Sequence, residues 1–422
     1  MTELENAAGA QASAPGEAHS SAGGDADGDR QPAPAPARML NRVAPRVGRR
    51  GFLAMAGGAA ASLPLVRARE SVAAPRPGER DAQAPLVIAR QGSFLIGGSV
   101  VTNPGTFDPI ALTPDGQTIH GDHAYAQYQI PAAARRYPLV MWHGGGQFSK
   151  TWESTPDGRD GYQNIFLRRG FATYIIDQPH RGRAGRATAN GTIDAVPGPG
   201  PTGEQGIFIR FRLGIWPSYF PGVQFPRNAA ALDQWWRQQT PDTAPTSNDM
   251  ATDPVAALFD KIGPAVLLTH SASGVLGWIT ATKSSNVRAV YAYEPVTQVF
   301  PEGQVPPPVD SGPLGPITGT PIPLADFQQL TKIPIEIIWG DNFPTADQAP
   351  SGYPDIEIWQ GRIIMAQNFV DLINAMGGQA RLVHLPDIGI FGNTHFAMSD
   401  LNNVQIANLL SDFLRRHNFD RR

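Results

Sequence analysis

The sequence around Ser271 has the residue types and spacing of an activated nucleophile. An apolar run over 265–269 leads into His270-Ser271-Ala272-Ser273-Gly274, and a helical pattern follows. A strand, a sharp turn built from small residues and a helix are what a nucleophile elbow requires. The motif departs from G-x-S-x-G, since Thr269 and Ser273 occupy the two glycine positions. An ordinary helix N-cap after a buried strand is the alternative interpretation of the motif. Ser273 is the rival candidate for the nucleophile.

A run of glycines earlier in the chain offers unobstructed backbone N–H groups. His143-Gly144-Gly145-Gly146 directly follows an apolar run over 137–142. Glycine lets the backbone approach a developing negative charge without side-chain interference. We therefore expect the N–H groups of Gly145 or Gly146, together with that of Ala272, to form an oxyanion hole. A phosphate-binding loop is disfavoured because no Lys-Ser or Lys-Thr pair ends the run.

One histidine and two acidic residues are candidates to complete a triad with the serine. His395 lies in Gly392-Asn393-Thr394-His395-Phe396, after the last predicted strand, and is the candidate base. Glu294 follows the apolar run 287–293, and Asp341 follows the next one, 333–339. Either carboxylate could orient the imidazole and stabilise its protonated form, which is all that the third residue must do. These residues alone leave the choice between the two acids open.

Strand-like and helical segments alternate along most of the chain and would position these residues. Opening strands are predicted at 86–89, 93–101 and 124–130, and buried strands at 137–142, 171–176, 265–269, 287–293, 333–339 and 380–385. Amphipathic helices are predicted at 253–262, 359–376 and 403–416. This alternation predicts an α/β fold, with a mostly parallel central sheet flanked by helices.

Two long segments interrupt the alternation, at about 181–249 and at 300–321. Both are rich in Gly and Pro, and the first also carries many aromatic residues. Segments of this length are usually functional insertions, so we expect the first to be a cap or lid. Its aromatic rings either form the cap's own small core or line an apolar pocket. Our candidates for residues lining the substrate pocket are Phe148, Trp216, Phe220 and Phe396.

The N-terminal region has a different composition. Residues 1–38 are poor in large apolar residues and are predicted to be a disordered lead. Residues 39–74 contain Arg49-Arg50-Gly51-Phe52-Leu53 and then a short apolar run, the pattern of a twin-arginine export signal. Residues 75–422 would form the mature domain, periplasmic or secreted, without a membrane span. The absence of cysteine is compatible with export after cytoplasmic folding.

The net charge of −3 gives no electrostatic reason to expect binding to nucleic acid. His120, Asp122 and His123 are only a weak metal signal, and a polar hairpin turn explains them better. Neither a metal nor an organic cofactor is required by the predicted chemistry. A homodimer is left open.

Several motifs of the chain together carry a resemblance to a known family. They are His143-Gly144-Gly145-Gly146-Gln147, Lys150-Thr151-Trp152-Glu153, Thr155-Pro156-Asp157-Gly158-Arg159, Asp177-Gln178-Pro179, Arg181-Gly182-Arg183 and Gly392-Asn393-Thr394-His395. With them the chain resembles an atypical subgroup of secreted bacterial carboxylesterases in the α/β-hydrolase superfamily, over most of its length from about residue 93. In that subgroup the acid is a glutamate after the sixth strand, so the resemblance implies Glu294. It also implies a small-molecule ester substrate and a Ser-His-Glu triad. A lactonase or another reaction on the same triad, and a non-catalytic binding protein, are the alternative functions.

Overall fold

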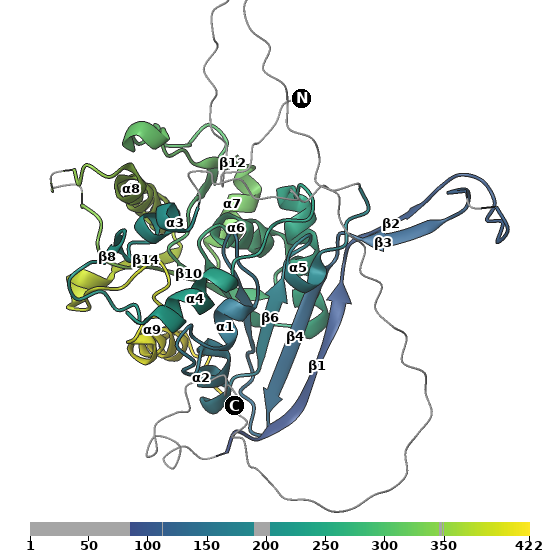
Figure 1. Cartoon of the computed structure of the whole chain (residues 1–422), viewed down its shortest axis with the longest axis horizontal. Helices are drawn as coiled ribbons and strands as arrows, with labels where there is room; N and C mark the ends of the chain where they lie inside the picture. The colour runs from purple at the N-terminus through teal and green to yellow at the C-terminus, as the bar shows by residue number, and fades with distance from the viewer. Residues whose placement is uncertain (1–84, 112, 190–202, 346–347, 349) are drawn as a thin grey trace, which may run out of the picture. The chain divides into compact units, whose positions relative to one another are not determined.

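An eight-stranded sheet forms the centre of the fold (Figure 1). The computed structural model describes residues 85–422 except 112, 190–202, 346–347 and 349. The predicted lead and export signal, and part of the predicted cap, therefore lie outside the described residues. The strands, in sheet order, are β1 (Ile88–Ile96), β4 (Ala124–Pro131), β6 (Thr173–Asp177), β5 (Leu139–Trp142), β9 (Ala265–His270), β10 (Val287–Tyr293), β13 (Pro334–Trp339) and β14 (Gln379–His384).

The strands from β6 to β14 run parallel, while β4, near one edge, runs antiparallel to both of its neighbours, β6 and β1. Parallel strands need helical crossovers, which cover both faces of a sheet. The main helices are α1 (Lys150–Glu153), α2 (Tyr162–Arg168), α5 (Asn248–Ile262), α6 (Ser273–Lys283), α7 (Leu324–Leu330), α8 (Pro354–Ala375) and α9 (Asn403–Arg416). The predicted α/β class with a mostly parallel sheet is confirmed.

Alternate residues of the central strands pack against different helices. In β5, Val140 and Trp142 belong to a buried cluster shared with α5, α6, α7 and α8. Leu139 and Met141 belong to a second cluster shared with α2 and α9. This period of two is the geometry of a strand whose two faces are both buried. The central strands are accordingly mainly apolar, with a few buried polar residues such as Thr269 and His270 in β9 and Glu336 in β13.

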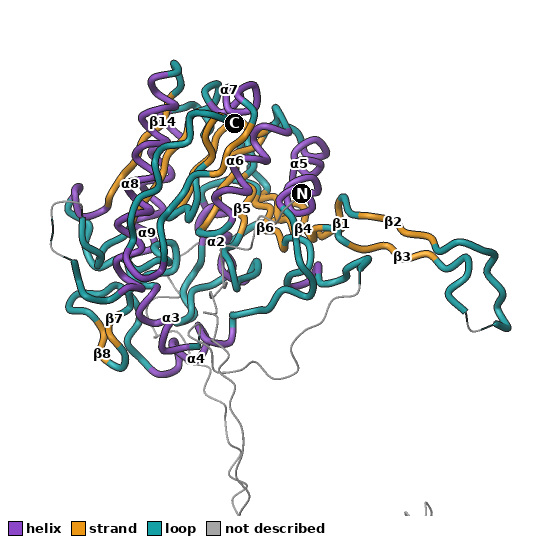
Figure 2. The backbone as a smooth tube through the Cα atoms, turned by 90° about the horizontal axis from the view of Figure 1, so that it is seen from above, coloured by secondary structure: helices purple, strands orange, loops and turns teal. Residues whose placement is uncertain are grey.

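One predicted strand is wrong in its boundaries. The expected strand 93–101 is interrupted at Gly97 and Gly98, both of which have positive φ. Residues before them belong to β1, which also includes the second half of the expected strand 86–89. Residues after them form β2 (Ser99–Thr102), which pairs with β3 (Thr118–Gly121) in a separate ribbon that extends beyond the sheet (Figure 2).

Two other segments contain more regular structure than the sequence predicts. The region predicted as a cap contains α3 (Glu204–Arg210), β7 (Gly214–Ile215), β8 (Ser218–Tyr219) and α4 (Ala229–Arg237). The predicted loop 300–321 is bounded by β11 (Val299–Pro301) and β12 (Thr320–Ile322), which pair in parallel. In the part of the chain that the structure describes, no helix is long and apolar enough to cross a membrane.

Candidate active site

The turn between β9 and α6 holds Ser271 in a strained conformation. Its φ is +58°, a backbone angle that residues other than glycine rarely adopt. The amide of Ser271 donates to the carbonyl of Tyr293, while its own carbonyl accepts from Gly274 and Val296. These bonds fix the turn from both sides. A strained backbone that several hydrogen bonds hold in place is typical of functional turns and fits a nucleophile elbow.

Thr269 occupies the first glycine position of the motif, and a glycine in α6 makes room for its side chain. A Cβ added to Gly277 of α6 would lie 2.5 Å from Cγ2 of Thr269, so the helix can approach this larger residue only because it has glycine there. Gly274 similarly faces Pro295. Ser273 is buried, and its hydroxyl accepts from the amide of His270. The rival serine therefore acts as a structural group inside the turn.

The glycine run after β5 lies against the elbow. A Cβ added to Gly144 would come within 3.0 Å of Cβ of Ser271, and one added to Gly145 within 3.4 Å of Cβ of Ala272. The carbonyl of Gly144 accepts from the Arg181 guanidinium at 3.3 Å. The carbonyl of Gly146 accepts from the amide of Thr240 at 2.9 Å. Of the predicted oxyanion-hole residues, Gly145 thus lies against Ala272 beside the predicted nucleophile, whereas Gly146 lies against Gln239 and Thr240.

Glu294 is in direct contact with the candidate base. Its Oε2 lies 2.5 Å from Nδ1 of His395, and both side chains are almost wholly buried. Burial alone would raise the pKa of Glu294, but Arg212 and His395 outweigh it and hold the pKa at about 2. An ionised carboxylate can only accept hydrogen bonds, so Nδ1 of His395 carries the ring proton. Nε2 is then the basic nitrogen, and it is buried without a hydrogen-bond partner among the described residues.

The imidazole of His395 is held between aromatic rings. It stacks on Phe211 with ring centroids 4.7 Å apart, and it lies 4.5 Å from the ring of Trp359 in α8. Burial lowers its pKa to about 4, with Glu294 opposing the shift and Arg212 and Arg362 adding to it. The ring is therefore neutral near pH 7, the state in which it can accept a proton.

His270 links the base to the elbow. Its Nε2 donates to the backbone carbonyl of His395 at 2.8 Å, and the two rings lie 4.6 Å apart. Since His270 adjoins Ser271, the bond holds the histidine loop beside the serine.

Asp341 has a different environment. Its Oδ1 accepts from the amide of Asn342 at 2.6 Å, and its Oδ2 accepts from the amide of Gly392 at 2.7 Å. Its own amide donates to the carbonyl of Asn393. The structure therefore brings Glu294 to the imidazole and uses Asp341 to anchor the loop that carries it.

Two known proteins that this chain is similar to are an esterase and a lipase. No family model matches the sequence. A solved bacterial esterase, described as novel, is 31% identical, covers 79% of this chain and 98% of its own, and has a TM-score of 0.63. A probable secreted lipase, phiG, of Fungal sp. (strain ATCC 74256) is 24% identical over 330 residues, which are 69% of this chain and 85% of the lipase.

The chain belongs to the α/β-hydrolase superfamily.

A buried arginine that the sequence did not single out contacts both candidate acids. Arg212, in the segment after α3, donates from Nη2 to Oε1 of Glu294 and from Nε to the carbonyl of Asp341. Its side chain is fully buried, and its φ is +62°. The amide of Gly340 also donates to Oε1 of Glu294. No local pattern marks Arg212, because its partners lie on other strands of the fold.

The hydrolase also buries Asp400 beneath the histidine loop. Its carboxylate accepts from the amide and hydroxyl of Thr394 and from the side chain of Asn393. Burial raises its pKa to about 7, although these hydrogen bonds lower it. The sequence does not single out this residue, since an aspartate in a turn shortly before a helix has many ordinary roles.

The segment between β6 and α5 contacts the site through aromatic rings. Phe208, Phe225 and Trp235 are buried, and Phe211 and Trp235 pack on Phe396 beside His395. The rings therefore form a core that continues into the hydrolase domain. Two arginines of the same region hold the segment in place through ion pairs. Arg181 pairs with Asp242, and Arg183 pairs with Asp177.

The four candidate pocket residues lie in different environments. Phe396 is buried between His270 and His395. Trp216 is 41% exposed and packs edge-on against Phe208. Phe148 and Phe220 are half-buried, the first beside Gly182 and the second against the cores of both sheet faces. Only Phe396 contacts the candidate base directly.

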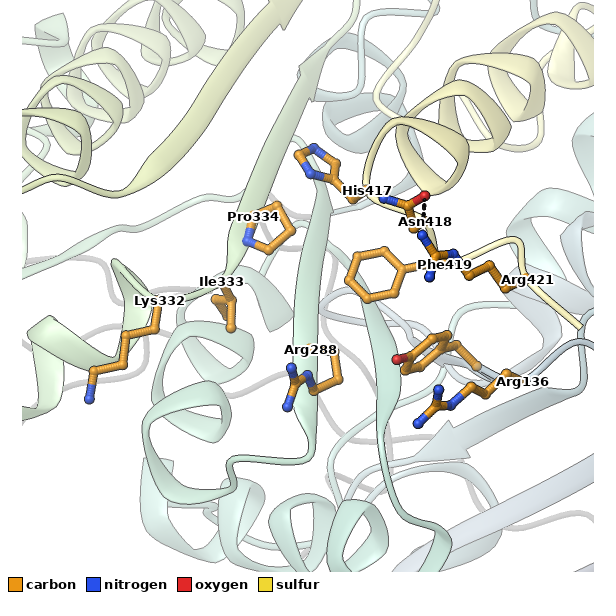
Figure 3. A pocket seen from close by; sticks show the side chains of 10 residues that line it. Arg136, Arg288, Lys332, Ile333, Pro334, His417, Asn418, Phe419 and Arg421 are labelled. Atoms are coloured by element: carbon orange, nitrogen blue, oxygen red, sulfur yellow. Dashed lines mark hydrogen bonds between the residues drawn. The ribbon is translucent and has the colours of Figure 1, made fainter.

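A cavity of about 330 Å³ lies away from these residues. Figure 3 shows side chains around it that come from the amino ends of strands, such as Arg288 at the start of β10 and Pro334 at the start of β13. Ser271 and Glu294 instead follow the carboxyl ends of β9 and β10. Ligands of open α/β sheets bind at the carboxyl ends, so this cavity is not the active site. Among the described residues, no group of three or more His, Asp or Glu could hold a metal ion.

Proposed function

We propose that the hydrolase cleaves carboxylic esters through an acyl-enzyme, with Ser271 as nucleophile, His395 as base and Glu294 as acid. That the chain is an ester-hydrolysing enzyme follows from its 31% identity to the bacterial esterase over 79% of its length. The assignment of the triad rests chiefly on one observation. Nδ1 of His395 donates a hydrogen bond to Glu294 at 2.5 Å, and Nε2 has no hydrogen-bond partner among the described residues. The turn at Ser271, which has a positive φ, lies beside this histidine.

The proposed first half-reaction transfers the acyl group to the enzyme. The hydroxyl oxygen of Ser271 attacks the ester carbonyl carbon while its proton passes to Nε2 of His395. Glu294 stabilises the imidazolium that forms, because its carboxylate is ionised and hydrogen-bonded to Nδ1. The N–H groups of Gly145 or Gly146 and of Ala272 donate to the oxyanion, and each such donor is typically worth about 10²–10³ in rate.

The tetrahedral intermediate collapses by breaking the bond to the alcohol. The imidazolium of His395 gives its proton to the leaving oxygen, so the alcohol departs neutral. A water molecule then attacks the acyl carbonyl, with its proton again taken by His395. Release of the carboxylic acid returns that proton to Ser271 and restores the free enzyme.

The export of this hydrolase is part of the same proposal. The fungal relative is described as a secreted lipase, and Arg49-Arg50 stands before a short apolar run in residues 39–74. The first supports secretion, and the second supports a twin-arginine route to the periplasm or exterior. Replacing the two arginines by lysine in a producing cell should retain the protein in the cytoplasm; continued export would exclude this route.

Hydrolysis of p-nitrophenyl esters of increasing acyl length tests the activity. The wild-type enzyme should release p-nitrophenol from at least the short members, with saturation kinetics. The variant Ser271→Ala should lose at least about 10³-fold in kcat, since removal of a triad member leaves only oxyanion-hole and binding effects. A Ser271→Ala variant as active as wild type would overturn the triad assignment, whereas hydrolysis of lactones alone would change the substrate class.

A further inference from the structure

Arg362 in α8 is a cation without a counterion close to the proposed triad. Its Nε is buried and has no hydrogen-bond partner, and it takes part in none of the ion pairs within the described residues. The side chain nevertheless keeps partial exposure. A guanidinium withdrawn from water is costly unless a negative group compensates it. Among the described residues, the carboxylates of Glu294 and Asp355 act on this charge only at longer range, and neither forms an ion pair with it.

One tryptophan connects this cation to the catalytic histidine. The guanidinium carbon of Arg362 lies 4.5 Å from the ring centroid of Trp359, and the ring of Trp359 lies 4.5 Å from that of His395. The indole is itself fixed, since it is fully buried and donates from Nε1 to the carbonyl of Arg210. Stacking on a rigid aromatic face orients a guanidinium in advance of binding.

The neighbouring arginines differ from Arg362 because each has a carboxylate. Arg212 is paired with Glu294, and Arg210 with Asp355 at 2.6 Å. Helix α3, which carries Arg210, packs on α8 (Figure 1). Of these three arginines, Arg362 is therefore the one without an ion-paired carboxylate among the described residues.

We propose that Arg362 binds an ionised carboxylate of the substrate, so that the preferred esters are those of acids or alcohols that carry a second, free carboxylate group. Arg binds carboxylate through two parallel N–H bonds, and such charge-assisted bonds are the strong ones. Burial, together with Arg210 and Arg212, lowers the pKa of Arg362 to about 9 and so disfavours its charged form. A bound carboxylate would stabilise the charged form again. This inference rests on the proposed ester hydrolysis and specifies its substrate class.

Two pairs of esters test the proposal, each pair differing only in one charge. The first is mono-p-nitrophenyl adipate and its methyl ester, which place the carboxylate on the acyl half. The second is 4-acetoxybenzoate and its methyl ester, which place it on the alcohol half. All rates are measured at pH 8, where His395 is neutral in every variant, so a change in its protonation does not enter. The variants are Arg362→Gln and Arg362→Lys, with Arg288→Gln at the opposite edge of the sheet as matched control.

The wild-type enzyme should prefer the free acid over its methyl ester in at least one pair. Arg362→Gln should then lose about tenfold or more in kcat/KM on that acid, mainly through KM, and less than about threefold on its methyl ester. Arg362→Lys should recover part of the loss, and Arg288→Gln should behave as wild type. The pair that responds identifies the half of the ester that carries the carboxylate.

Equal losses on acid and methyl ester would overturn the proposal and give Arg362 a structural role. A wild-type enzyme without preference for the acid in either pair would overturn it as well. Failure of the proposed function is a different result: the wild type would then hydrolyse no member of either pair faster than Ser271→Ala.

Discussion

Arg212 and Glu294 form an ion pair in which the side chains are 0% and 2% exposed. The same carboxylate accepts from His395 through its other oxygen. Because Arg212 belongs to the segment between α3 and β7, the region predicted as a cap is tied directly to the proposed catalytic acid. This pair keeps Glu294 ionised although it is fully buried. It therefore maintains the tautomer of His395 that leaves Nε2 free to act as a base.

Replacing Arg212 by Met should destabilise the protein strongly. The change leaves the buried Glu294 without its charge partner, and breaking one side of a buried ion pair typically costs about 3–5 kcal/mol in unfolding free energy. Urea unfolding followed by circular dichroism measures the difference. Arg237→Met is the matched control, since Arg237 pairs with Asp233 on the surface and should show no measurable change. Equal stability of the two variants would contradict the importance of the buried pair.

The choice between the two acids is tested by Glu294→Gln and Asp341→Asn. A glutamine at 294 would donate its amide N–H to Nδ1 of His395, so the ring proton would move to Nε2 and the ring could not act as a base. By analogy with other serine triads, we expect kcat to fall by about 10³–10⁴. Asp341→Asn should lose less than about tenfold, because Asp341 anchors the backbone at Gly392 and not the ring. A larger loss of kcat/KM in the Asp341 variant would assign the acid to Asp341.

The packing of the glycine loop predicts unequal effects at two neighbouring positions. The added Cβ in Gly144→Ala would lie 2.8 Å from Nδ1 of His270 and 3.0 Å from Cβ of Ser271. Loop and elbow must then separate, and we expect a loss of about 10²-fold or more in kcat. In Gly145→Ala the added Cβ meets only Ala272, at 3.4 Å, so a loss below about tenfold is expected. The reverse order of the two losses in a p-nitrophenyl ester assay would contradict this account of the loop.

The acid side of the pH profile should reflect the environment of His395. Its pKa is lowered from 6.5 to about 4, so the base remains unprotonated, and kcat/KM remains near its plateau, well below pH 6.5. Activity falls as the pH drops through the lowered pKa. Arg362→Gln removes a positive charge that disfavours the imidazolium, so the midpoint of this limb should move to higher pH. Profiles of kcat/KM on a neutral ester between pH 4 and 9 measure both effects; a midpoint that moves to lower pH would contradict the assigned charge effect.

The sequence predicted the sheet and the serine turn well because their signals are local. Apolar runs such as 287–293 can bury both faces of a strand, and β10 has these bounds in the structure. The small residues after Ser271 mark a sharp turn before a helix, and α6 begins at Ser273. Glycines had a less obvious effect at Gly97 and Gly98, where positive φ values end β1 and redirect the chain into a separate ribbon.

The surroundings of the triad could not be predicted in the same way. Glu294 and Asp341 follow adjacent parallel strands, β10 and β13, so both must lie at the same edge of the sheet. Which carboxylate meets the imidazole depends on side-chain direction and on the route of the histidine loop. Arg212 and Arg362 depend on contacts between segments far apart in the chain, and neither position has a periodic or motif signal.

The most direct test of the account is to locate the covalent adduct formed with a fluorophosphonate probe. The purified enzyme is labelled at pH 8, digested and analysed by tandem mass spectrometry. We predict one adduct per chain, on Ser271, formed at a rate reduced by about 10²-fold or more in Glu294→Gln and absent in Ser271→Ala. An adduct on Ser273, or labelling that persists in Ser271→Ala, would contradict the assignment of Ser271 as the nucleophile.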